Sequence, residues 1–119
     1  MENTIRKQLI LGKKDFYTKH LNIISNFLPV EFTPKEIDVV ASFMSLEGDI
    51  AKDRFGTSAR KIVREELGIS PGGLGNYLRS LKKKNLIVDV NGTTKIQPLL
   101  SPATSQQMYM FKLVKDEEV

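Results

Sequence analysis

Lysine and arginine side chains are concentrated in one part of this sequence, and the chemistry they offer is the binding of anions. Between residues 58 and 86, seven basic residues stand against two acidic ones, so this segment carries a charge of +5. The whole chain is only +4, and the remaining residues therefore sum to about −1. The basic residues are Arg60, Lys61, Arg64, Arg79, Lys82, Lys83 and Lys84. Ammonium and guanidinium groups at this density attract a polyanion, which predicts binding chemistry.

Two short amphipathic helices are expected to position these charges. The first ends at Gly68, and its apolar face consists of Ala59, Ile62, Val63 and Leu67. Ser70 can cap the second helix, and Pro71 suits its first position, where no N–H is required. The apolar stripe of the second helix consists of Leu74, Leu78 and Leu81. Two helices joined by a short turn, the second presenting cations outward, form the helix-turn-helix pattern.

The outer side of the second helix carries side chains that suit the edges of DNA bases. Asn76 can pair bidentately with adenine and Arg79 with guanine. Ser80 and Lys83 are expected to meet phosphate, whereas Tyr77 suits either stacking or half-buried packing. The predicted DNA-contacting residues are Arg60, Lys61, Ser70, Gly72, Gly73, Asn76, Tyr77, Arg79, Ser80, Lys82, Lys83, Asn91, Thr93 and Lys95.

Three glycines open the second helix, at positions 72, 73 and 75. Each costs about 1 kcal/mol of helix stability relative to alanine, so something should offset that cost. Close approach of bare backbone to a phosphate is one explanation. Close packing against the preceding helix is a second, and a first turn that is not helical is a third. A nucleotide-binding loop is disfavoured because no Gly-Lys-Ser/Thr follows and no strand precedes.

The composition argues against catalytic chemistry. The sequence has no cysteine, which removes disulfides, thiolate nucleophiles and cysteine zinc sites. The single histidine, His20, is expected to be a structural residue. Because no acid and base or nucleophile stand in a defined motif, we expect no enzyme and no cofactor. No apolar run approaches the roughly 20 residues that span a bilayer, and we expect a cytosolic protein with no membrane partner.

The flanking regions complete one domain. Residues 1–28 are expected to form an N-terminal strand or helix extension, with a helix from 13 to 27 whose apolar face includes Phe16, Ile24 and Phe27. A helix from 34 to 46 should follow, because Thr33 and Glu36 make a capping box around a proline. Apolar residues on both of its sides indicate neighbours on both flanks. Residues 47–57 are expected to be a loop.

A β-hairpin should follow the basic helix. Residues 86–90 are rich in β-branched side chains whose expected exposure alternates, which is typical of a strand. Asn91-Gly92 is the strongest short hairpin signal. Residues 95–100 are the expected return strand, and residues 108–114 can form a further strand. Residues 115–119 are expected to be a frayed acidic tail. The fold class is therefore mainly α with a small β-wing, a winged helix-turn-helix over residues 29–114 with an N-terminal helical extension.

The phrases FTPKEIDVVASFM and TSARKIVREELGISPGGLGNYLRSLKKKNLI resemble those of a known family. They are similar to the winged helix-turn-helix DNA-binding proteins of bacteria and tailed phages, including the MarR-like group. The resemblance covers residues 28–96 and is strongest from 57 to 87. It implies double-stranded DNA binding through the helix from Ser70 to Lys84. It also implies contact of the hairpin, from Asn91 to Lys95, with neighbouring DNA backbone.

Two classes of function remain open from the sequence. The first is a double-stranded DNA-binding transcriptional regulator, positioned by phosphate contacts from Arg60, Lys61, Lys83 and Lys95. A homodimer through the N-terminal helix would suit such a protein, and no small-molecule substrate is evident. The second class is a phage structural, adaptor or protein-interaction module that keeps the fold without specific DNA binding. A replication or packaging accessory protein is a narrower variant of the first.

Overall fold

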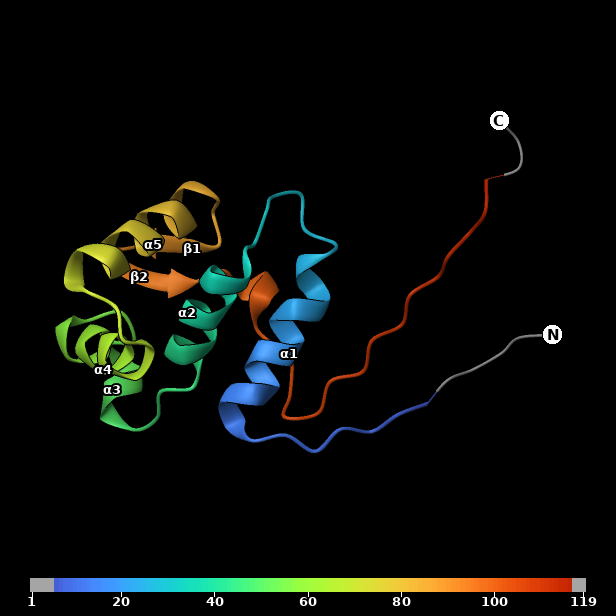
Figure 1. Cartoon of the computed structure of the whole chain (residues 1–119), viewed down its shortest axis with the longest axis horizontal. Helices are drawn as coiled ribbons and strands as arrows, with labels where there is room; N and C mark the ends of the chain where they lie inside the picture. Colours follow the sequence, from blue (N-terminus) through green and yellow to red (C-terminus); the bar gives the residue numbers. More distant parts are fainter. Residues whose placement is uncertain (1–5, 117–119) are drawn as a thin grey trace.

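The computed structural model describes residues 6–116, and within them the chain is mainly helical with one small antiparallel sheet (Figure 1). The elements are α1 (Lys13–Ser25), α2 (Pro34–Met44), α3 (Asp49–Lys52), α4 (Thr57–Leu67), α5 (Pro71–Lys83), β1 (Ile87–Val90), β2 (Thr93–Ile96) and the 3-10 turn η1 (Pro98–Leu100). Residues 1–5 of the expected N-terminal extension and residues 117–119 of the expected acidic tail lie outside the described residues.

Helix α2 is the centre of the fold. It begins with the predicted capping box, in which the Thr33 hydroxyl accepts from the Glu36 N–H and the Glu36 carboxylate accepts from the Thr33 N–H. Its side chains from Val39 to Met44 are all buried. Helix α1 packs on one side of α2, and α4 and α5 pack on the other. The predicted apolar neighbours on both flanks are therefore confirmed, and α2 contributes more buried apolar residues than any other element of the described chain.

The two cationic helices begin and end close to where their local signals predict. Gly68 ends α4 in the left-handed conformation, with φ +66°, which a residue without a Cβ adopts at little cost. Ser70 caps α5, because its hydroxyl accepts from the Gly73 N–H at 2.9 Å. The apolar stripe of α5 is buried as expected, whereas Ile62 on α4 is 40% exposed and not part of the core.

The hairpin forms at the predicted turn, but the return strand is displaced. Asn91 and Gly92 both have positive φ, 52° and 79°, which fits a two-residue type I′ turn. In the register, Val90 pairs with Thr93 and Ile87 with Ile96. The return strand is thus residues 93–96, whereas residues 95–100 were expected. Pro98 explains the difference, because it cannot donate to a ladder and begins η1 here.

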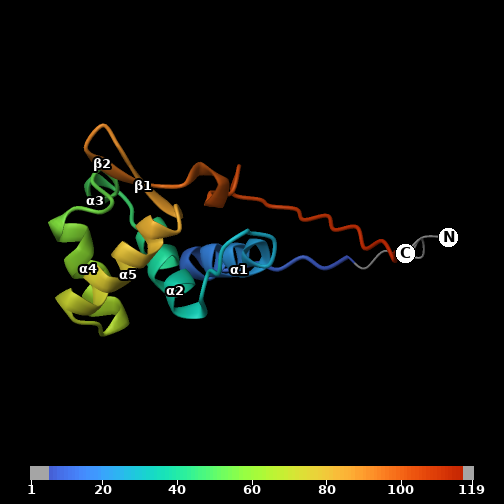
Figure 2. The same cartoon turned by 90° about the horizontal axis from the view of Figure 1, so that it is seen from above.

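Three further expectations differ from the structure. The expected loop at 47–57 contains the short helix α3. Phe27 lies beyond the end of α1 and is 63% exposed, stacked on Phe111 and outside the core. Residues 108–114 form no strand, because no neighbouring strand pairs with them in the described chain. They run as an extended tail away from the helices (Figures 1 and 2).

His20 connects α1 to the C-terminal part of the chain through hydrogen bonds to Leu100 and Tyr109. Its ring is 4% exposed, as expected of a structural histidine. Nε2 donates to the Leu100 carbonyl at 2.9 Å, so in the neutral ring Nδ1 accepts from the Tyr109 hydroxyl at 2.5 Å. Burial lowers the pKa of His20 below its ordinary 6.5 and outweighs the opposing influence of the Leu100 carbonyl. The neutral ring is therefore part of the folded state.

We expect the folded protein to lose stability as His20 becomes protonated. Because its folded pKa is lowered, the unfolded chain takes up the proton first, and stability should fall as the pH drops below 6.5. Urea unfolding between about pH 7.5 and 5.5 should show a steeper loss for the natural chain than for His20→Asn. Since the sequence has one histidine, its imidazole NMR signal reports the pKa directly. A titration midpoint at or above 6.5 would contradict this account.

Candidate nucleic-acid interface

A cationic hollow lies between α4 and α5. Its volume is about 290 Å³, and it is lined by Arg60, Gly75, Leu78, Arg79 and Lys82. Arg60 reaches this hollow from α4, and its Nε donates to the Phe55 carbonyl at 2.7 Å. The bond fixes the base of the guanidinium group through Nε and does not use its two outer nitrogens. Three positive side chains from two helices thus border a space that an anionic group can enter.

The two side chains predicted to read bases bond to each other. Asn76 and Arg79 are both exposed, and an Arg79 guanidinium nitrogen donates to Asn76 Oδ1 at 2.8 Å. This pair occupies one turn of α5, as spacing of three residues allows. In the free protein each side chain therefore orients the other.

The structure tests the three explanations for the glycines of α5. The first turn is helical, which excludes an irregular start. A Cβ added at Gly72 or Gly75 would meet nothing within 4 Å, which excludes close packing against α4 at these two positions. Only at Gly73 would it come near a neighbour, the Ser70 hydroxyl at 3.1 Å. Gly72 and Gly75 therefore each leave open space, and Gly75 lines the cationic hollow.

A buried carboxylate fixes α5 to the core. Glu36 is 3% exposed, and its carboxylate accepts from the Ser80 hydroxyl and from the Lys84 ammonium, both at 2.8 Å. Burial is the largest influence on its pKa and would raise it. The hydrogen bonds from Lys84, from Thr33 and from Ser80 together outweigh burial and lower the pKa of Glu36 below its ordinary 4.5. Glu36 is thus charged in the folded protein and holds α5 against α2.

This network changes the roles expected for two residues of α5. The Ser80 hydroxyl points to Glu36 and not to the outer side of the helix, so we leave Ser80 out of the proposed phosphate contacts. Lys84, whose place on the flank of the helix suited either contact with the DNA backbone or solvation, instead pairs with the same carboxylate and is only 25% exposed. Tyr77 is half-buried and packs on the core, which favours the packing role that the sequence left open.

The remaining predicted contacts lie on the surface of α4, α5 and the hairpin. Lys61 and Lys83 are exposed, as are Thr93 and Lys95 on β2. Lys82 lies 3.4 Å from Asp89 of β1, whose other oxygen accepts from the Thr94 hydroxyl. The hydrogen bond from Thr94 is the main cause that lowers the pKa of Asp89. This carboxylate connects the hairpin to α5, and nothing in its local sequence marks it for that role.

A larger cavity, about 670 Å³, lies between α1, α3 and the hairpin. Phe16, Tyr17 and Phe55 contribute its aromatic lining. Two of the cations that line it are engaged within the chain: Lys13 pairs with Glu47, and the Arg54 guanidinium donates to the carbonyls of Phe43, Met44 and Leu46. Among residues 6–116 no three histidine, aspartate or glutamate side chains stand close enough to hold a metal ion.

Comparison with known proteins adds no family to this geometry. No family model, no curated protein and no solved structure matches the chain. In the described part, no helix is both long enough and apolar enough to cross a membrane. The physical character of the α4–α5 surface is therefore the basis for a functional proposal.

Proposed function

We propose that this chain is a winged helix-turn-helix protein that binds double-stranded DNA, with α5 in the major groove, and that it serves as a transcriptional regulator. The observation that carries the proposal is the cationic hollow at Gly75, a glycine that internal packing does not require. Open helix backbone next to guanidinium and ammonium groups suits a backbone phosphate at close range. The resemblance of residues 28–96 to winged helix proteins supports the same proposal.

The proposed contacts divide by chemistry. Arg60 and Lys82 border the hollow and hold a phosphate there, which positions α5 without reading sequence. Lys61, Lys83 and Lys95 are exposed and add further phosphate contacts. Asn76 and Arg79 project from the outer side of α5 and read base edges. A role in replication or packaging would use the same contacts.

Fluorescence anisotropy with a random duplex of about 25 base pairs, titrated at several salt concentrations, tests this proposal. Phosphate neutralisation predicts an affinity that falls linearly with salt on logarithmic axes. Absence of binding even at low salt would overturn the proposed function. In that case the protein-interaction module would be the better explanation, since residues 108–114 expose a run of apolar side chains.

Gly75→Ala is expected to change stability and DNA affinity in opposite directions. The added methyl meets no neighbour, so the helix should gain about 0.5 to 1 kcal/mol. The same methyl projects into the hollow that the phosphate is proposed to occupy, so affinity should fall about tenfold, or roughly 1.4 kcal/mol. Urea unfolding and anisotropy measure the two effects. A variant that is more stable and binds DNA normally would show that no phosphate approaches Gly75.

A further inference from the structure

The tail that follows η1 is extended and has no partner for its backbone. Between residues 102 and 114 of the described chain, no backbone group bonds to another backbone group. In this described segment only the N–H groups of Ala103 and Gln106 form hydrogen bonds, and both donate to side chains within the tail. Residues 108–114 therefore present both edges of a strand, which is the backbone state that pairs readily with another strand.

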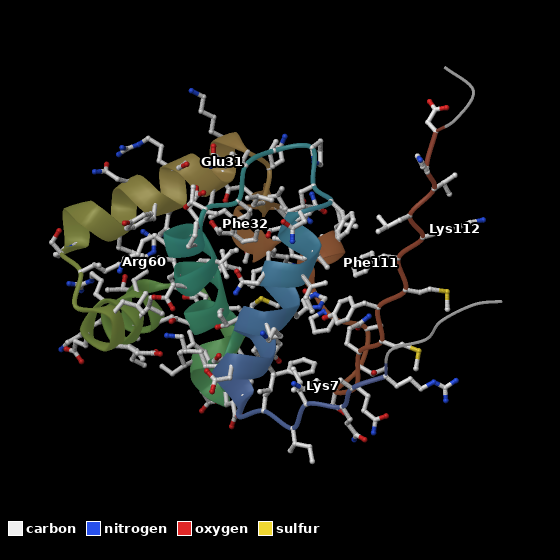
Figure 3. The ribbon with its side chains drawn as sticks, turned by 45° about the vertical axis from the view of Figure 1, so that its right-hand side comes forward. Lys7, Glu31, Phe32, Arg60, Phe111 and Lys112 are labelled. Carbon is white, nitrogen blue, oxygen red and sulfur yellow. The ribbon has the colours of Figure 1, made fainter. Side chains whose placement is uncertain are left out.

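Two aromatic anchors set which side of the tail faces the protein. Tyr109 bonds to His20, and the Phe111 ring stacks on Phe27 with 4.4 Å between centroids. Figure 3 shows Phe111 directed toward α1 and Lys112 directed away from it. The alternating residues Met108 and Met110 are 85% and 89% exposed. Leu113 is 97% exposed, although its position in the alternation places it on the same side as the anchors.

The charges of the tail argue against DNA as its partner and against a parallel pairing of two copies. Residues 101–111 carry no charge, and residues 112–118 hold two lysines against three acidic residues, a net charge of −1. Such a segment does not attract DNA, whose phosphates require cations. A parallel, in-register copy would place Lys112 beside Lys112 of the partner subunit, which is unfavourable. An antiparallel copy centred on Phe111 avoids this, because it places Lys112 opposite Met110 of the partner subunit.

We propose that two copies of this chain associate through an antiparallel pairing of residues 108–114, with Phe111 on the two-fold axis. In this register Met108 lies opposite Val114 of the partner subunit, and Leu113 lies opposite Tyr109 of the partner subunit. Met108 and Leu113, 85% and 97% exposed, thus meet apolar side chains, Met110 lies beside Lys112 of the partner subunit, and the unbonded backbone groups form a ladder. The sequence predicted a strand here, and the second copy supplies the neighbour that the single chain lacks. The sequence suggested a homodimer through the N-terminal helix, whereas the surface proposed here is the tail.

Two opposite charges at one exposed position test both the dimer and its register. Met110 faces Lys112 of the partner subunit twice in the pair, so Met110→Lys should weaken the dimer about tenfold relative to Met110→Glu. Sedimentation equilibrium of the full chain over about 1 to 100 µM measures the dissociation constants. Ile10→Lys, at an apolar position that is 92% exposed outside the tail, should leave the dimer unchanged.

Each result bears on the proposal. A natural chain that dimerises, with only Met110→Lys impaired, supports it. A monomer at about 100 µM would overturn it and would point to a different protein as the occupant of the tail. A dimer that neither Met110 variant affects would place the interface elsewhere, and equal weakening by both would exclude this register. Because DNA is absent from the experiment, the outcome is independent of the proposed function.

Discussion

Replacement of Glu36 by alanine is expected to lower the free energy of unfolding by about 3 kcal/mol, at the lower end of the cost of breaking a buried ion pair. The carboxylate is 3% exposed and satisfies the Ser80 hydroxyl, the Lys84 ammonium and the Thr33 N–H. All three donors lose their acceptor at once. The cost is limited because Lys84 is 25% exposed and its ammonium can turn toward water. Urea unfolding followed by circular dichroism measures the change.

Glu31→Ala is the matched control, since Glu31 is exposed and precedes the same helix. Its effect should stay within about 0.5 kcal/mol. A similar loss for the two variants would mean that the Glu36 network contributes nothing specific. Ser80→Ala should cost less than Glu36→Ala, because Lys84 and Thr33 keep their acceptor in that variant.

The same network predicts how acid affects the protein. The folded pKa of Glu36 is lowered, so the unfolded chain binds a proton more readily than the folded chain. The stabilisation by Glu36 is therefore complete well above pH 4.5 and is lost as the pH falls below that value. Glu36→Gln, which keeps the shape without the charge, should make unfolding less dependent on pH in this acidic range. His20 acts in the range near 6.5, so the two contributions separate along the pH axis.

Arg79→Ala is expected to reduce binding to a preferred DNA site by about 1 to 3 kcal/mol and to relax the choice of base there. The preferred site would come from selection among random duplexes. Lys83→Ala is the informative comparison, because it removes the same charge from the same helix at a position proposed to meet only phosphate. It should weaken all duplexes alike and reduce the salt slope by about 1. Equal losses on preferred and random duplex for Arg79→Ala would exclude base readout.

The hydrogen bond between Arg79 and Asn76 adds a further expectation to this experiment. Because the two side chains orient each other in the free protein, their substitutions should not be additive. Asn76→Ala alone should weaken the preferred site, and in the Arg79→Ala background it should weaken that site by a different amount. A double-mutant cycle on the selected duplex measures the coupling. Strict additivity would show that the bond has no role in recognition. Lys19→Ala, at an exposed position of α1, controls for the loss of one positive charge.

The sequence by itself determined the elements whose signals are local. The capping box at Thr33 and Glu36, the cap at Ser70 and the turn at Asn91-Gly92 each depend on residues within four positions of one another. Local backbone hydrogen bonds and φ preferences act over that range, so their residue types predict them. The same local reasoning placed most of the cationic residues on α4 and α5. It failed for the return strand, where Pro98 ended the ladder early.

Only the tertiary structure decided which of those residues are free to act. The bonds from Ser80 and Lys84 to Glu36 span 44 and 48 positions, and the bond between His20 and Tyr109 spans 89. A pattern of neighbours along the chain cannot show such pairs, because they exist only after α2, α5 and the tail are packed. The hollow at Gly75 also forms only when α4 and α5 meet, and its open space distinguishes among explanations that the sequence left equal. Packing brings distant side chains within hydrogen-bond distance, and this makes some charges structural and leaves others available to a partner.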